Sequence, residues 1–142
     1  MQVIDKIIAN FTSNKSLYIG EKVTMSEHMI QTAMLAEKAK CDDNLICSSL
    51  LHDYGHFVIE DPNQLVTDKV DGRHEIIGAN YLKNFFHNKI IEPILLHVEA
   101  KKYLSRTVSI NFRNTNITMT VIIADIDQSI SVNSPWDLTS FN

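Results

Sequence analysis

The stretch Ser49-Leu-Leu-His-Asp-Tyr-Gly-His-Phe57 decides how the rest of the chain is interpreted. It places a histidine directly before an aspartate, His52 and Asp53, at the predicted end of an apolar helix. Imidazole binds iron, zinc, copper and nickel, and carboxylates serve as harder ligands. Adjacent side chains at a helix end can diverge, so the histidine can hold one ion while the aspartate bridges two. The pair therefore indicates a metal site.

The residues before this stretch predict helices. Apolar side chains recur at helical spacing over residues 3–11 and again from Thr24 to about Lys40. Thr24 and Glu27 have the spacing of a capping box, which starts a helix by satisfying its first backbone N–H groups. We therefore expect two helices in this part of the chain, separated by a polar, turn-like segment.

The remaining helices are predicted from cap and turn signals. Asp42 or Asp43 is expected to cap a helix that ends near Asp53, and Gly55 suits a helix stop. Residues 57–72 read as a polar loop. Two more helices are predicted over residues 73–86 and 89–104. The fold class that follows is all-α, a helical bundle.

Composition limits the classes of function. The chain has 142 residues, enough for one domain, and a net charge of -4 with no cluster of Lys and Arg, so we expect no nucleic-acid partner. We see no apolar run long enough to span a membrane and no export signal, so we expect no membrane partner and a cytoplasmic location. Cys41 and Cys47 are then expected to be reduced and unbridged.

The composition changes near residue 106. Residues 1–106 hold 26 charged side chains, whereas residues 107–142 hold four, and Ser, Thr and Asn supply 15 of those 36 positions. Apolar and polar residues alternate over 108–112 and 117–121, which predicts two strands. We therefore expect a metal-binding helical domain over 1–106 and an atypical tail over 107–142, irregular or β-like, that could be a truncated end.

The histidines support a metal site because of where they fall. Five of the six lie at or near predicted helix ends, at positions 28, 52, 56, 74 and 97. Helical bundles assemble metal sites from side chains that facing helices project to one centre. The alternative for any single histidine is a helix cap or a half-exposed residue. His87 lies outside the pattern, and we expect it at the surface.

A longer set of motifs carries a resemblance to a known family. The set comprises Tyr18-Ile-Gly-Glu21, Glu27-His28-Met-Ile-Gln31, the stretch around His52 and Asp53, His74-Glu-x-x-Gly78-Ala79-x-Tyr81-Leu82, and Pro93-Ile-x-x-His97-Val-x-Ala-Lys101-x-Tyr103-Leu104. It resembles the HD-domain mixed-valent di-iron oxygenases of phosphonate catabolism. The resemblance runs from Tyr18 to Leu104. It implies an enzyme that uses two iron ions and dioxygen to cleave the carbon–phosphorus bond of a small aminophosphonate.

The resemblance also implies residue roles. Tyr18 matches a tyrosine that ligates iron when substrate is absent, and Glu21 matches a carboxylate that receives the substrate amine. His56 and Lys101 match cationic groups that hold the phosphonate. The residues that match iron ligands, with Asp53 as the bridge, are His28, His52, Asp53, His74 and His97.

Two of these roles have plain alternatives in the sequence. Lys101 follows His97 by four residues, which places both on one helix face, where a lysine could grip an anionic substrate. Lys101 also lies in an Ala-Lys-Lys run and could equally be a solvated lysine. Tyr18 could equally be a loop tyrosine packed on the core.

The family's last ligand is an aspartate in a Trp-Asp context, and here the pattern leaves two candidates. Trp136-Asp137 keeps the dipeptide, whereas Asp125 resembles the closing aspartate of HD phosphohydrolases. Two alternative functions follow: a metal-dependent phosphohydrolase acting on a nucleotide or phosphate ester, and a degenerate family member that binds without turnover.

Overall fold

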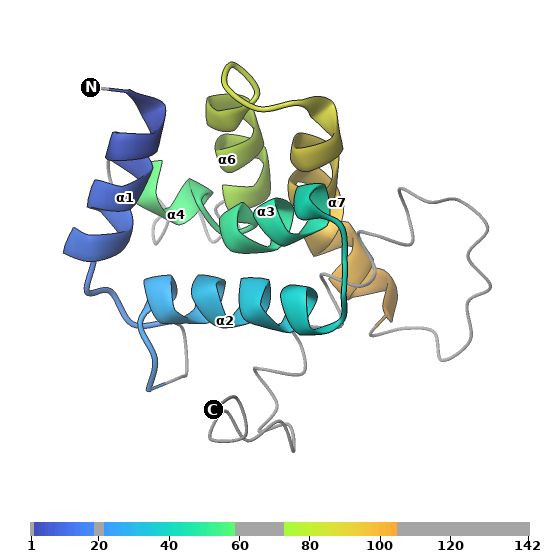
Figure 1. Ribbon diagram of the computed structural model, residues 1–142, viewed down its shortest axis with the longest axis horizontal. Helices are drawn as coiled ribbons and strands as arrows, with labels where there is room; N and C mark the ends of the chain where they lie inside the picture. Colours follow the sequence, from blue (N-terminus) through green and yellow to red (C-terminus); the bar gives the residue numbers. More distant parts are fainter. Residues whose placement is uncertain (1, 19–21, 59–72, 105–142) are drawn as a thin grey trace.

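The computed structural model describes residues 2–18, 22–58 and 73–104, and within these ranges the chain is helical (Figure 1). An isolated antiparallel bridge joins Leu17 to Thr24. The helices in chain order are α1 (Val3–Ser13), α2 (Met25–Lys38), α3 (Asp43–Leu51), α4 (Gly55–Val58), α6 (His74–Leu82) and α7 (Asn88–Leu104). The all-α prediction is confirmed. The tail and its two predicted strands lie outside the described residues.

Side-chain caps start the two helices that lead to the His-Asp pair. The Thr24 hydroxyl accepts from the Glu27 N–H at 3.2 Å, and the Glu27 carboxylate accepts from the Thr24 N–H at 2.7 Å. The predicted capping box is therefore present at the start of α2. Asp42 caps α3 by accepting from the Leu45 N–H at 2.9 Å. These caps satisfy backbone donors that a helix start otherwise leaves unpaired.

Gly55 does not stop a helix, and that prediction is wrong. It begins α4, one short turn after α3 ends. The reason for a glycine here is space, because a Cβ atom at Gly55 would overlap the carbonyl oxygen of His74 and lie 2.9 Å from the Gly78 nitrogen. A Cβ at Gly78 would in turn lie 2.9 Å from the Gly55 nitrogen. This glycine pair brings the backbones of α4 and α6 into direct contact.

The helices pack around the His-Asp pair in the order α2, α3, α7, α6 and α4. Figure 1 shows α2 and α3 side by side, with α6 and α7 on the other side of α3. α1 is joined to this group through Tyr54, whose hydroxyl accepts from the Asn10 side chain at 2.7 Å and whose ring stacks on Phe11. The buried cluster that links the elements contains Ile7, Met25, Met29, Leu51, Tyr54, Ala79, Leu82, Ile91 and Ile94.

Two predictions from composition can be compared with the described residues. Cys41 and Cys47 are free and half-buried, so the expectation that they are unbridged is confirmed. Among the described helices, none combines the length and the apolar character that crossing a membrane would require.

Candidate metal centre

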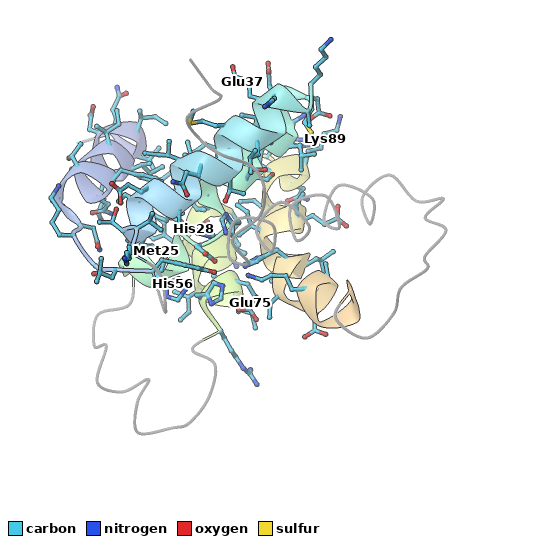
Figure 2. All side chains as sticks on the ribbon, turned by 90° about the horizontal axis from the view of Figure 1, so that it is seen from below. Met25, His28, Glu37, His56, Glu75 and Lys89 are labelled. Atoms are coloured by element: carbon cyan, nitrogen blue, oxygen red, sulfur yellow. The ribbon has the colours of Figure 1, made fainter. Side chains whose placement is uncertain are left out.

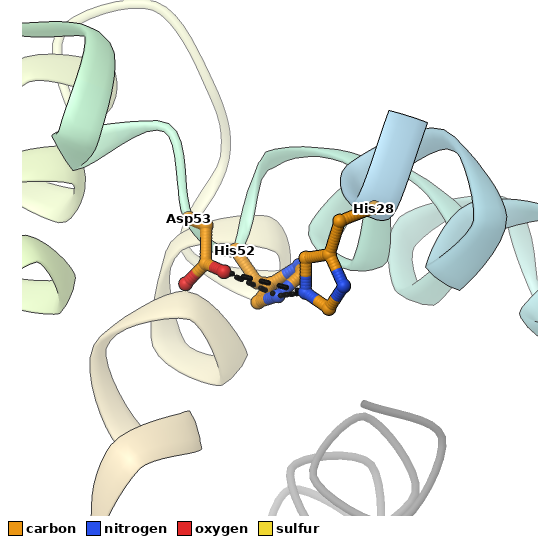
Figure 3. Close-up of side chains that lie close together, drawn as sticks. All are labelled: His28, His52 and Asp53. Carbon is orange, nitrogen blue, oxygen red and sulfur yellow. Dashed lines mark hydrogen bonds and ion pairs between the residues drawn. The ribbon is translucent and has the colours of Figure 1, made fainter. Parts of the chain in front are cut away.

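The His-Asp pair and three further histidines converge in the middle of the bundle. His28 Nε2 lies 3.3 Å from His52 Nε2, and the two nitrogens lie 3.4 and 3.1 Å from Asp53 Oδ2. Figure 3 shows His28 reaching from α2 toward His52 and Asp53, which follow α3. We call His28, His52 and Asp53 Oδ2 the first triad. Its three atoms are close enough to share one metal ion.

A second triad lies on the other oxygen of the same carboxylate. His74 Nε2 and His97 Nε2 lie 3.1 Å apart, and they lie 3.0 and 3.3 Å from Asp53 Oδ1. His74 begins α6 and His97 lies within α7. This second triad is also compact enough for one ion. Asp53 therefore divides its two oxygens between two pairs of histidines, which is the arrangement of a carboxylate that bridges two ions.

The centre is buried. His28, His52 and His97 are fully buried, and Asp53 and His74 are 2% and 8% exposed. Burial of a charged carboxylate among imidazoles is costly unless opposite charge compensates it. Burial by itself raises the pKa of Asp53, but the adjacent His52 and contacts with His28 and His74 outweigh it and hold that pKa well below its ordinary value. Asp53 is therefore an anion that needs cations beside it.

Two of the histidines are oriented by their own helices. His52 Nδ1 donates to the Ser49 carbonyl at 2.7 Å, and His97 Nδ1 donates to the Ile94 carbonyl at 2.6 Å. Each bond joins a histidine to the residue three positions earlier. A proton fixed on Nδ1 leaves the Nε2 lone pair for a metal ion. The hydrogen bonds thus select the tautomer that a ligand to the centre requires.

The donor set fits a pair of metal ions. Asp53 Oδ1 is buried, and no hydrogen bond of acceptable geometry reaches it from the described residues, although two imidazole nitrogens lie within 3.3 Å. Burial also lowers the pKa of His97, so its Nε2 carries a lone pair at neutral pH. Bound cations would compensate a buried carboxylate and the imidazole lone pairs that converge on it. Imidazole with a bridging carboxylate suits iron and other transition metals.

Tyr18 lies against the first triad. Its ring stacks on the His28 ring with centroids 3.8 Å apart and an angle of 10° between the planes. The backbone holds it there, because the Tyr18 N–H donates to the Val23 carbonyl at 2.9 Å, beside the Leu17–Thr24 bridge. Tyr18 also packs against the buried hydrophobic cluster, so both interpretations of this residue fit the structure, and its role at the site stays a prediction. Glu21 lies outside the described residues.

His56 lies against the second triad. Its ring stacks on His74 with centroids 4.3 Å apart. Burial, and then the neighbouring His74, lower the pKa of His56 to about 4. At neutral pH this imidazole is uncharged, so it can offer an anion a hydrogen bond rather than a positive charge. The sequence-based expectation of a cationic His56 is refined accordingly.

The other residues considered in the sequence lie at different distances from the two triads. Lys101 is half-buried on α7, one turn beyond His97. His87 is exposed, and its Nδ1 accepts from the Lys89 N–H at 3.2 Å, so its placement outside the centre is confirmed. Glu75, whose carboxylate faces His74, has no role predicted from the sequence, although the dipeptide His74-Glu75 belongs to the motifs quoted above. In Figure 2 His28 lies in the interior, while the labelled Glu37 and Lys89 lie at the far end of the bundle.

Comparison with known proteins places these residues in context. The HD domain family matches residues 25–126, a span that includes Asp125 and leaves out Asp137, both outside the described residues. The [1-hydroxy-2-(trimethylamino)ethyl]phosphonate dioxygenase (glycine-betaine-forming) of Leisingera caerulea is 43% identical over 90 residues, which are 63% of this chain and 46% of that protein. The hydroxymethylphosphonate dioxygenase of Gimesia maris is 40% identical over 90 residues, 61% of this chain and 44% of that protein.

A third relative has no assigned activity. It is an uncharacterised protein of Acanthamoeba polyphaga mimivirus, 41% identical over 90 residues, which are 61% of this chain and 41% of that protein. The chain thus spans less than half the length of the curated relatives it matches.

Proposed function

The chain belongs to the HD-domain family, and from that premise we propose that it is a di-iron oxygenase that cleaves the carbon–phosphorus bond of a small aminophosphonate with dioxygen. The observation that carries the proposal is the division of the Asp53 carboxylate between two histidine pairs, 3.0 to 3.4 Å from their nitrogens. The similarity to two phosphonate dioxygenases supports it. The metal-ligand roles of His28, His52, Asp53, His74 and His97 are part of the proposal.

The proposed reaction balances with dioxygen as the oxidant. A 1-hydroxyphosphonate, R–CH(OH)–PO₃²⁻, and O₂ give the carboxylate R–COO⁻, HPO₄²⁻ and one proton. The carbon–phosphorus bond breaks, the carbon is oxidised by four electrons, and both atoms of dioxygen enter the products. Two iron ions, when bound, would supply the redox chemistry and a positive surface for the substrate oxygens.

In the proposed function, residues around the centre contact different parts of the substrate. We assign to Lys101, one turn beyond His97 on α7, the positive charge that holds the phosphonate, and to His56, stacked on His74, a hydrogen bond to it. Tyr18 occupies the opposite side, stacked on His28. Glu21 would receive the amine, a role that rests on the resemblance alone. The buried centre keeps bulk water from the reacting carbon.

The experiment that tests the proposal is an oxygen-dependence assay. The chain, purified from iron-supplemented cells, is incubated with 2-amino-1-hydroxyethylphosphonate, its trimethylamino analogue and hydroxymethylphosphonate, with and without oxygen. We expect phosphate release that requires oxygen and matches oxygen consumption one to one. The His87→Ala variant should behave like the unchanged chain, and His52→Ala should lose the activity. No phosphate release from any of the three would contradict the proposal.

A metal-dependent phosphohydrolase is the second candidate. The observation that favours it is that the family match reaches Asp125, the residue that resembles the closing aspartate of such hydrolases. A panel of nucleotides and phosphate esters under anaerobic conditions separates the two. Phosphate release without oxygen would replace the oxygenase proposal. Binding of a phosphonate with neither oxygen consumption nor product would instead identify a non-catalytic family member.

A further inference from the structure

Within the described parts of the chain, His74 has no orienting hydrogen bond like those of His52 and His97. Those two histidines donate from Nδ1 to a carbonyl three residues earlier in the same stretch of helix. His74 is the first residue of α6, so no earlier residue of that helix can accept from it. A histidine that holds a metal ion through Nε2 normally donates its other N–H to a carboxylate or carbonyl. The second triad therefore needs an acceptor from another source.

Glu75 is placed to be that acceptor. Its Oε2 lies 3.9 Å from His74 Nδ1, which is too long for a direct hydrogen bond and within ion-pair range. The same oxygen is buried and has no hydrogen-bond partner among the described residues. A buried carboxylate oxygen without a partner is costly, and the nearby imidazole N–H is a donor that can satisfy it after a small side-chain rotation.

We propose that Glu75 is a positioning residue that accepts a hydrogen bond from His74 Nδ1 and strengthens metal binding at the second triad. The inference rests on the proposed metal centre. His56, stacked on the His74 ring, limits the rotation of that ring and leaves the carboxylate to fix its tautomer. In Figure 2 the labelled His56 and Glu75 lie at the same end of the molecule, on the side where α6 begins.

A simpler explanation for an acidic residue here is helix stabilisation. Glu75 lies in the first turn of α6, where a negative charge interacts favourably with the helix dipole. Asp43 holds the same kind of position in the first turn of α3 and is exposed. Asp43→Asn is therefore a matched control, because it removes a first-turn charge without touching either triad.

The test measures metal binding directly. Cobalt(II) is titrated anaerobically into the metal-free chain and competed with a chelator, and the affinities of the two sites are fitted separately. We expect Glu75→Gln to weaken one site about 10- to 100-fold, the usual effect of losing an orienting partner, and to leave the other within about twofold. Asp43→Asn should leave both sites unchanged. Equal affinities in Glu75→Gln and the unchanged chain would overturn the proposal.

A double-mutant comparison assigns the effect to His74. If Glu75 acts through that histidine, Glu75→Gln should have no further effect on cobalt binding in a His74→Ala background. A full additional loss there would mean that Glu75 acts by another route. If Glu75→Gln does not fold, Glu75→Asp serves in the same comparison, because it keeps the charge and withdraws the carboxylate by one methylene. The predicted one-site loss is then tested with Asp43→Glu as its control.

The outcomes also separate this proposal from the ones it rests on. Failure of the oxygenase assay leaves the cobalt titration unaffected, because cobalt binding needs no substrate or oxygen. No cobalt binding by the unchanged chain would overturn the metal centre and the role of Glu75 together. Two cobalt sites that both ignore Glu75→Gln would overturn the role of Glu75 alone.

Discussion

The two triads share the Asp53 carboxylate, but their histidines come from different parts of the chain. One histidine in each triad, His52 in the first and His97 in the second, is oriented in the same way. His52 follows α3 and His97 lies in α7, yet both donate from Nδ1 to the carbonyl three residues before them. Each orienting bond is made within one helical turn. These two histidines therefore depend little on the packing of distant elements.

The other histidine of each triad, His28 in the first and His74 in the second, is held by ring stacking instead. Tyr18 stacks on His28, and His56 stacks on His74, so each ring is kept in place by a residue from another element. Both stacking residues are among those that we propose to lie at the substrate. Each triad thus contains one self-oriented histidine, which is oriented by a hydrogen bond to a nearby backbone carbonyl, and one histidine whose ring packs against a residue of another element.

The largest effect is expected when the residue common to both triads is removed. Asp53→Ala should abolish binding of both ions, because each histidine pair loses its anionic partner. With free metal at 100 times the dissociation constant, binding stabilises the folded chain by about 2.7 kcal/mol for each ion, and this part should vanish. Metal analysis and thermal melts with and without chelator measure it. One ion retained at full affinity would show that one histidine pair is independent of Asp53.

Removing one self-oriented histidine should affect one triad. His52→Ala and His97→Ala should each lose one ion preferentially, with a loss of about 2.7 kcal/mol of metal-linked stability under the same conditions. His87→Ala is the control, because that side chain is exposed and away from the centre, and it should change stability by less than about 0.5 kcal/mol. Equal metal content in His52→Ala and His87→Ala would mean that the helix-end histidines are not ligands.

The glycine pair offers a test that acts on the second triad through the backbone. Gly55→Ala should destabilise the fold by about 1–3 kcal/mol, because the new methyl group meets the backbone of α6 at His74 and cannot be avoided by a side-chain rotation. Gly78→Ala should cost less, because its contacts are longer and alanine favours a helix interior by about 1 kcal/mol. Chemical denaturation of the metal-free variants measures both. The reverse order would show that α4 and α6 can separate freely.

The smallest effect is expected when the rings that stack on His28 and His74 are removed. Tyr18→Ala removes the ring that stacks on His28, and His56→Ala removes the ring that stacks on His74. An aromatic pair contributes about 0.5–1.5 kcal/mol, so metal affinity at the adjacent triad should fall by roughly 2- to 10-fold. The same metal titration detects it. A complete loss of either ion would mean that the stacked residue is itself indispensable for metal binding.

Much of the fold could be predicted from local signals. The capping box at Thr24 and Glu27 marked the start of α2, and apolar spacing with Asp42 marked α3, because both signals act within a few residues. Gly55 was misread because a glycine after an apolar helix usually indicates its end. Its actual cause, contact with the backbone at His74, involves a residue 19 positions away, and no local pattern reports it.

The convergence of the five proposed metal ligands could be predicted from the sequence, but the arrangement of the histidines around the two Asp53 oxygens could not. A bundle with one histidine on each of several helices predicts that they converge, and the five residues lie together at the centre. Which oxygen of Asp53 faces which pair depends on the three-dimensional path of the chain, and so does the stacking of Tyr18 on His28. The proximity of the Glu75 carboxylate to His74 could have been predicted, because the two residues are adjacent in sequence.

The shared carboxylate of Asp53 has one further consequence. Its two oxygens are joined through a single carbon with fixed bond lengths, and each faces a different histidine pair. In the proposed centre one side chain would therefore join the two metal sites, so that any shift of Asp53 would be transmitted to both.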